Sequence, residues 1–148
     1  MTSLNTYLTF EGNCENAFNF YRSVFGGEFA HVGRFSDMPA DPTYPIGDEF
    51  RNQIMHISLP IGEHSILMGS DTGGHGGSVT VGTNFSISIN TDSKDKADVY
   101  FAKLSADGKV TMPMASTFWG DYFGMLTDRF GINWMISFAE SAPQEEKK

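Results

Sequence analysis

Residues 4–29, LNTYLTFEGNCENAFNFYRSVFGGEF, combine the signals of a strand, a turn and a helix. The first seven residues of this stretch are rich in β-forming types, and Gly12 ends the run. Asn13 is placed to cap a helix, because its side chain can accept a hydrogen bond from a free amide of the first turn. The predicted apolar stripe of that helix consists of Ala17, Phe20, Tyr21, Val24 and Phe25. The pair Gly26-Gly27 is expected to end the helix.

A second copy of this pattern occupies residues 84–110, NFSISINTDSKDKADVYFAKLSADGKV. Residues 84–90 alternate, with Phe85, Ile87 and Ile89 on one predicted buried face. Asp92 or Ser93 is expected to cap the following helix. Its apolar stripe is Ala97, Tyr100, Phe101 and Leu104. The same offset separates the caps and the stripes of the two copies, which indicates an internal duplication.

Each predicted helix is followed by three predicted strands, at 28–36, 53–60 and 64–70 and again at 109–113, 121–127 and 133–138. The sequence therefore predicts an α+β fold of two βαβββ modules, 1–71 and 84–140. Between them lies a glycine-rich hinge, 72–83, and after them a frayed polar tail, 141–148. Residues 37–51 contain three prolines and no period, which predicts a long loop.

The stretch DTGGHGGS, residues 71–78, is the most glycine-rich part of the chain. No helix pattern follows its glycines, so we do not expect a phosphate-binding loop. A hinge between the modules is the favoured interpretation. A mobile loop at the edge of a cleft and a ligand site with His75 are the alternatives.

Composition narrows the possible functions. The net charge is −8, with ten Lys and Arg scattered along the chain, which argues against nucleic acid as a partner. No apolar run is long enough for a membrane span. The single cysteine, Cys14, allows no internal disulfide, which fits a cytoplasmic location. Cys14 is expected to be a small buried residue rather than a nucleophile.

Three segments carry a resemblance to a known family: TFEGNCENAFNFYRSVFGGE, ILMGSD and TFWGDYFGMLTDRFGINWMISF. Together they resemble the vicinal oxygen chelate superfamily, which includes glyoxalase I, bleomycin-resistance proteins and extradiol dioxygenases. The closer similarity is to its PhnB-like branch, some members of which carry an old 3-demethylubiquinone-9 3-methyltransferase label. The resemblance implies a glyoxalase/bleomycin-resistance-like fold with the two modules paired around a cleft, a small-molecule ligand and a homodimer.

Metal-dependent members of that superfamily place a His, Gln or Glu ligand on the first and last strand of each module. The corresponding positions here are Thr6, Met68, Asn84 (or Ser86) and Met135. None is an imidazole or a carboxylate, so we expect no metal. We also expect no cofactor, because no glycine-rich turn of the nucleotide-binding type is present.

The segment NQIMHISLP, residues 52–60, contains the candidate catalytic residue. Its alternation predicts Met55, Ile57 and Leu59 on one face and His56 and Ser58 on the other. His56 is the best available general acid or base, because imidazoles exchange protons near neutral pH. The predicted ligand-binding residues around it are Thr6, Ser58, Met68, Asn84, Ser86, Trp119, Asp121 and Met135, with Ser88 and Ser137 in the same polar lining.

Some of these residues have a purely structural alternative. Met68 and Met135 would also serve as ordinary core filling, and Trp119 as an aromatic plug beside Gly120. Trp134 is expected in the core. Three functions remain open: a metal-independent binding protein for a small organic molecule, an enzyme of the lyase, isomerase or dioxygenase type, and a dimeric structural or regulatory domain.

Overall fold

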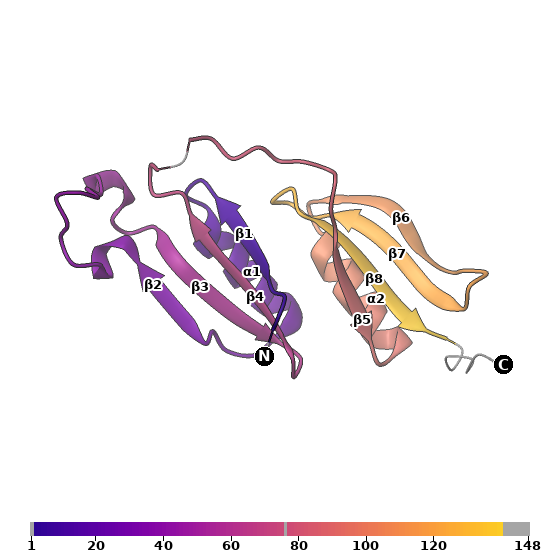
Figure 1. The fold of residues 1–148 in the computed structure, drawn as a ribbon. Coiled ribbons are helices and arrows are strands. Elements are labelled where there is room, and N and C mark those ends of the chain that lie inside the picture. The colour runs from indigo at the N-terminus through magenta and orange to yellow at the C-terminus, as the bar shows by residue number, and fades with distance from the viewer. Residues whose placement is uncertain (1, 76, 141–148) are drawn as a thin grey trace. The chain divides into compact units, whose positions relative to one another are not determined.

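The computed structural model describes residues 2–75 and 77–140. The chain folds into two compact units, Met1–Thr80 and Val81–Lys148 (Figure 1). The predicted tail at 141–148 lies outside the described residues. Among the helices of the described part, none is both long and apolar enough to cross a membrane.

The first unit contains one helix against one four-stranded sheet, together with two short 3-10 helices in its long loop. Its elements are β1 (Thr6–Phe10), α1 (Cys14–Phe25), β2 (His31–Arg34), η1 (Phe35–Asp37), η2 (Asp48–Phe50), β3 (Ile54–Ile61) and β4 (Ser65–Asp71). The strand order is β1-β4-β3-β2. β1 runs parallel to β4, and the other neighbours are antiparallel.

The second unit repeats this topology. Its elements are β5 (Ile87–Thr91), α2 (Lys94–Ser105), β6 (Lys109–Ser116), β7 (Asp121–Thr127) and β8 (Asn133–Ala139). The strand order is β5-β8-β7-β6, again with a parallel first pair. The predicted α+β fold of two βαβββ modules is therefore confirmed.

The buried face of α1 differs from the predicted stripe. Its buried residues are Cys14, Ala17, Phe18, Tyr21 and Val24, whereas Phe20 and Phe25 are only partly buried. Phe18 fits because β4 carries a glycine opposite it: a Cβ on Gly69 would lie 2.6 Å from Phe18 Cε1. Periodicity alone allows either set of residues, and contact with the sheet decides between them.

The cap of α1 is also different from the prediction. Asn13 occupies the N-cap position, but its side chain makes no capping hydrogen bond. Asp71, at the end of β4, takes that role: its Oδ1 accepts from the amides of Gly12 at 2.7 Å and Cys14 at 3.1 Å. Its Oδ2 accepts from the amide of Ile54 at 2.9 Å. In α2, by contrast, Ser93 caps as expected, accepting from Lys96 N at 3.1 Å.

β5 begins later than predicted, so Asn84, Phe85 and Ser86 precede the strand. The side chain of Asn133 donates to the carbonyls of Gly82 and Phe85, which holds this segment outside the strand ladder. Phe85 is 55% exposed, so the prediction that it is buried is wrong.

Candidate functional site

The first sheet has one face covered by α1 and one face without a helix. Leu8, Ile57, Leu59 and Leu67 point to the covered face and are buried. The helix-free face is the one that carries the polar side chains.

Tyr7 and His56 meet on the helix-free face. Tyr7 Oη and His56 Nδ1 are hydrogen-bonded at 3.2 Å, and the ring of His31 lies 5.6 Å from that of His56, centre to centre. Ser58 and Met68 are register partners on the same face. Three of the predicted site residues, His56, Ser58 and Met68, are thus brought together.

Thr6 does not join this group. Side chains alternate along a strand, so Thr6 shares the α1 side with Leu8, and Tyr7 takes the helix-free side. Thr6 therefore lies on the opposite face of the sheet from His56, and not beside it as predicted.

Met55 is on the helix-free side as well, although alternation predicted it with Ile57. The pairing of β2 with β3 jumps from Gly33↔His56 to Arg34↔Ile54, which leaves Met55 as an extra residue in a β-bulge. A Cβ on Gly33 would lie 3.5 Å from Met55 Cε, beside His31. The bulge turns Met55 toward the pocket described next.

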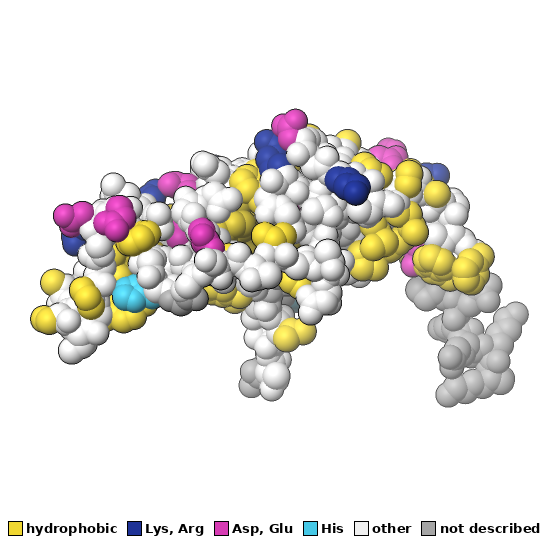
Figure 2. Space-filling model, turned by 90° about the horizontal axis from the view of Figure 1, so that it is seen from above, with side chains coloured by type: hydrophobic (Ala, Val, Ile, Leu, Met, Phe, Trp, Pro, Cys, Tyr) yellow, Lys and Arg dark blue, Asp and Glu magenta, His cyan; other side chains and the backbone are white. Residues whose placement is uncertain are grey.

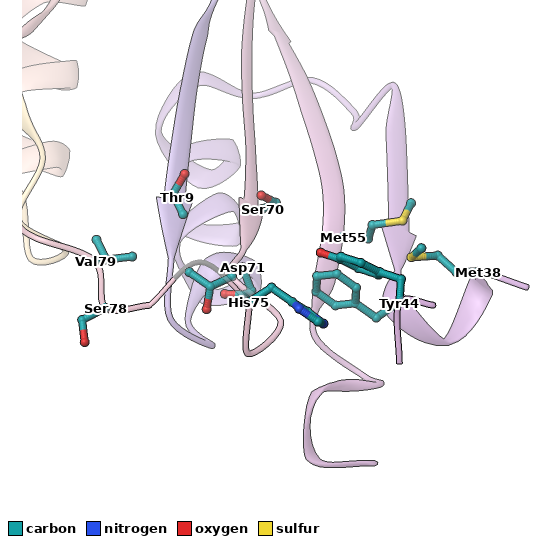
Figure 3. Close-up of a pocket in the computed structure, with 11 residues that line it drawn as sticks. Thr9, Met38, Tyr44, Met55, Ser70, Asp71, His75, Ser78 and Val79 are labelled. Carbon is teal, nitrogen blue, oxygen red and sulfur yellow. The ribbon is translucent and has the colours of Figure 1, made fainter. Parts of the chain in front are cut away.

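A pocket with a volume of ≈ 740 Å³ opens at one end of this face (Figure 3). It lies between the end of the sheet, the long loop after β2 and the glycine-rich segment after β4. Its lining consists of Thr9, Phe35, Met38, Tyr44, Met55, Ser70, Asp71, Thr72, His75, Ser78 and Val79. Figure 3 shows Thr9 and Ser70 on one side and Tyr44, Met38 and Met55 on the other.

The glycine-rich segment packs against the long loop at this pocket. The rings of His75 and Tyr44 are stacked with centres 4.1 Å apart, and His75 Nε2 lies 3.0 Å from the carbonyl oxygen of Pro45. Gly73 and Gly74 have positive φ, and a Cβ on either would lie 2.5 Å from a phenyl carbon, of Phe35 and Phe50 respectively.

The sequence did not predict that the glycine-rich segment and the long loop would lie against each other. The signals were present, namely three prolines in a long loop and a histidine among glycines, but no pattern specifies which loops meet.

The second unit gathers another part of the predicted site. Ser88 and Met135 are register partners on its helix-free face, and Ser137 Oγ lies 2.6 Å from Asn90 Oδ1 on that face. Asn84 and Ser86 lie before the strand, as described above.

Trp119 and Asp121 meet directly. Trp119 Nε1 donates to Asp121 Oδ2 at 3.1 Å, and the Trp119 ring packs edge-on near Phe123, with centres 6.0 Å apart. Trp134 is buried, as expected, and its Nε1 donates to Asp128 Oδ2 at 2.8 Å.

The thiol of Cys14 is buried, as expected. Burial raises the pKa of Cys14, and the carboxylates of Asp71 and Glu15 raise it further. The thiolate is the reactive form, so this thiol is kept unreactive at neutral pH.

The two βαβββ units, each with a four-stranded sheet, have the fold of glyoxalase-related proteins. FosX of Listeria monocytogenes, a fosfomycin resistance protein in complex with Mn(II), shares the fold at a TM-score of 0.62 and 12% identity, with 100% of this chain and 99% of that chain covered. The chain belongs to the PhnB-like family described as 3-demethylubiquinone-9 3-methyltransferase, whose model matches residues 2–137.

Three further proteins are more similar to this chain in sequence than FosX. Protein YjdN of Escherichia coli K12 is 31% identical, over 96% of this chain and 99% of the relative. The crystal structure of PA1353 from Pseudomonas aeruginosa is 37% identical, with a TM-score of 0.80 over 93% of this chain and 98% of that one. A putative 3-demethylubiquinone-9 3-methyltransferase, PhnB protein, from Bacillus cereus is 27% identical, with a TM-score of 0.71 over 93% and 100%.

FosX, which shares this fold, binds Mn(II), but the donors of this chain do not fit a divalent metal. At the predicted ligand positions Met68 and Met135, the residues paired across first and last strand on the helix-free faces are Tyr7 with Met68 and Ser88 with Met135. A phenol, a hydroxyl and two thioethers carry no negative charge at neutral pH and are poor ligands for Mn²⁺, Zn²⁺ or Fe²⁺. In the described part of the chain, no group of three or more His, Cys, Asp or Glu could hold a metal ion.

The family description implies a methyl donor, and the strand-to-helix turns do not fit a nucleotide-type cofactor. Such cofactors use free amides at a helix N-terminus that follows a glycine-rich turn. At α1 the amides of Gly12 and Cys14 are taken by Asp71, and at α2 the amide of Lys96 is taken by Ser93.

Proposed function

We propose that this PhnB-like protein binds a small organic molecule, without metal, in the pocket of its first unit. The observation that carries the proposal is the ≈ 740 Å³ volume of that pocket, which falls in the range of small-molecule sites, about 300–1,000 Å³. Its mixture of apolar walls and a few hydroxyl groups is also typical of such sites.

Each wall has a distinct role in this proposal. The hydroxyls of Thr9 and Ser70 orient polar groups of the ligand, and Met38 and Met55 adapt to its apolar surface. Ser58 and Met68 extend the site along the same sheet face, toward His56. Trp119, Asp121 and Met135, together with Asn84 and Ser86, remain proposed ligand contacts within the second unit.

Methionine methyl NMR gives a direct test. The chain is labelled at its methionine methyl groups and screened against a library of uncharged and charged fragments. A ligand of the pocket should shift the resonances of Met38 and Met55 and leave that of Met112, on β6, unchanged. Binding should weaken in Tyr44→Ala. If no fragment moves Met38 or Met55 at millimolar concentration, the proposal is wrong.

A second candidate function, metal-free acid–base catalysis, is favoured by the hydrogen bond between Tyr7 and His56. When His56 Nδ1–H donates to the Tyr7 hydroxyl oxygen, Nε2 carries the lone pair, so the imidazole is held in one tautomer with Nε2 free to accept a proton from a substrate. Lyase or isomerase chemistry needs a base of this kind.

The enzymatic proposal has its own test. A pocket ligand with an acidic C–H bond is incubated with the protein in D₂O, and deuterium incorporation is followed by NMR. Catalysis predicts exchange that is lost in His56→Gln, while the shifts at Met38 and Met55 persist. No exchange above the protein-free rate would leave binding as the function.

We further propose a cytoplasmic homodimer. Large apolar side chains are exposed on both units (Figure 2), among them Phe118, 97% exposed, and Trp119, 54% exposed. Exposed groups of this size are often covered by a partner, and symmetric dimers are the commonest oligomers. Light scattering at micromolar concentration should report twice the 16.3 kDa of one chain; the mass of a single chain would contradict the proposal.

A further inference from the structure

We propose that the pocket of the first unit selects an uncharged molecule with a flat aromatic ring and excludes phosphates and phosphonates. This inference rests on the proposed function of the same site, and it adds the chemical class of the ligand. Three features of the lining carry it.

The first feature is a wall that suits a ring. Tyr44 and His75 are stacked at an interplanar angle of 17°, and His75 is held by its contact with the Pro45 carbonyl. The two rings are therefore ordered before a ligand arrives, which lowers the entropy cost of binding. The thioethers of Met38 and Met55 line the same side, and sulfur makes favourable contacts with aromatic rings.

The second feature is a polar wall of neutral groups. Thr9 and Ser70 are register partners on β1 and β4, so their side chains are neighbours at the sheet end of the pocket. Each hydroxyl can donate and accept one or more hydrogen bonds but carries no charge. This pair suits a phenol, a carbonyl or an ether oxygen on the rim of a ring.

The third feature is the absence of a cation to meet a phosphate. Among the described residues that line the pocket, none is lysine or arginine. Arg34, the chain neighbour of Phe35, is bound to Glu15 by two hydrogen bonds of 2.6 and 3.0 Å and to the carbonyl of Asn52. The carboxylate of Asp71 binds three backbone amides. A dianion would lose its hydration without a compensating charge, in a chain of net charge −8.

Two probes that share one ring system isolate the effect of charge. 2-Naphthol and 2-naphthyl phosphate are titrated separately into the methyl-labelled protein. We expect 2-naphthol to shift the methyls of Met38 and Met55 upfield through its ring current. We expect 2-naphthyl phosphate to bind at least about tenfold more weakly, because its charge is not compensated. Tyr44→Phe should keep 2-naphthol binding, Tyr44→Ala should weaken it, and Val99→Ala, at an exposed position of α2 in the other unit, should leave it unchanged.

The outcomes separate this inference from the function on which it rests. Equal or tighter binding of 2-naphthyl phosphate, with shifts at Met38 and Met55, would overturn the chemical class and leave the binding function intact. Failure of 2-naphthol to shift these methyls, when other fragments do, would have the same meaning. If neither the probes nor any fragment acts on Met38 and Met55, the proposed function itself fails.

Discussion

The carboxylate of Asp71, the last residue of β4, accepts a hydrogen bond from the backbone amide of Cys14, the first residue of α1. The same side chain binds the amides of Gly12 and Ile54 and is buried. One carboxylate thus joins β4, the start of α1 and the start of β3. A single residue thus links the start of α1 to the end of β4, next to the pocket.

Asp71→Ala should destabilise the protein by about 3 kcal/mol or more, because three amides lose their partner and at least one of them is buried. The free energy of unfolding from urea titration measures the effect. Asp92→Ala is the matched control: its carboxylate is exposed and makes one ion pair with Lys96, so we expect a change within about 0.5 kcal/mol. Similar losses for the two variants would contradict the role given to Asp71.

Phe18 and Phe20 should differ sharply when each is truncated. Phe18 is fully buried against Phe10 and Tyr21, so Phe18→Ala should cost about 3–5 kcal/mol. Phe20 is partly exposed, and Phe20→Ala should cost about 1 kcal/mol. Urea unfolding of the two variants under identical conditions gives the comparison. A larger loss for Phe20→Ala would restore the stripe that periodicity predicted.

Phe18 and Phe20 illustrate which features of the fold could be predicted from the sequence and which could not. Periodicity and glycine placement predicted both α-helices and the approximate positions of the strands, because those signals are local, but not the two 3-10 helices. The same spacing could not choose between Phe18 and Phe20, since the choice depends on Gly69, far away in the chain. Asp71 as the cap of α1 is likewise a contact between distant segments.

The candidate site was predictable only in part, for a similar reason. His56, Ser58 and Met68 share a face because side chains alternate regularly along β3 and β4 at these positions. On β1 the residue on the helix-free face is Tyr7 and not Thr6, because a shift of one residue places a side chain on the opposite face of the strand. The β-bulge placed Met55 on the opposite face of β3 from the predicted one. The pocket itself depends on two loops, around Tyr44 and His75, which have no periodic pattern.

The thiol of Cys14 should resist alkylation in the folded protein. Its pKa is raised, chiefly by burial, so at pH 8 iodoacetamide should modify the native chain far more slowly than the urea-unfolded chain. Mass spectrometry gives an unambiguous count, because the chain has one cysteine. Rapid labelling of the native protein, at the unfolded rate, would show that the thiol is accessible.

The same pKa shift makes stability depend on pH in a defined direction. A thiol with a raised pKa stays protonated in the folded state, so its contribution is complete below the unfolded value of about 8.5 and is lost as pH rises above it. The unfolding free energy of the wild type should therefore fall more steeply between pH 8.5 and 10.5, as an approximate window, than that of Cys14→Ala. Parallel curves would contradict this prediction.

Gly73 should be required for the shape of the pocket. Gly73 and Gly77 both have positive φ, but a Cβ on Gly73 would strike the ring of Phe35, whereas a Cβ on Gly77 would meet nothing within 4 Å. Gly73→Ala should therefore cost at least about 1 kcal/mol more than Gly77→Ala, because the backbone strain is shared and the clash is not. Gly73→Ala should also weaken 2-naphthol binding. Equal effects of the two substitutions on stability and binding would show that the packing of Gly73 on Phe35 is unimportant.

Purified protein should carry no stoichiometric divalent metal. His31 and His56 are the nearest approach to a metal site on the helix-free face of the first sheet, with ring centres 5.6 Å apart. Nδ1 of His56 is already bonded to Tyr7, and no carboxylate joins the two imidazoles in the described part of the chain. Two neutral imidazoles do not offset the cost of removing a divalent ion from water, and structural or catalytic zinc sites use at least three protein ligands. Elemental analysis after dialysis without chelator is the measurement. About one zinc, nickel, manganese or iron per chain, lost in His56→Ala, would refute this prediction and favour a metalloenzyme.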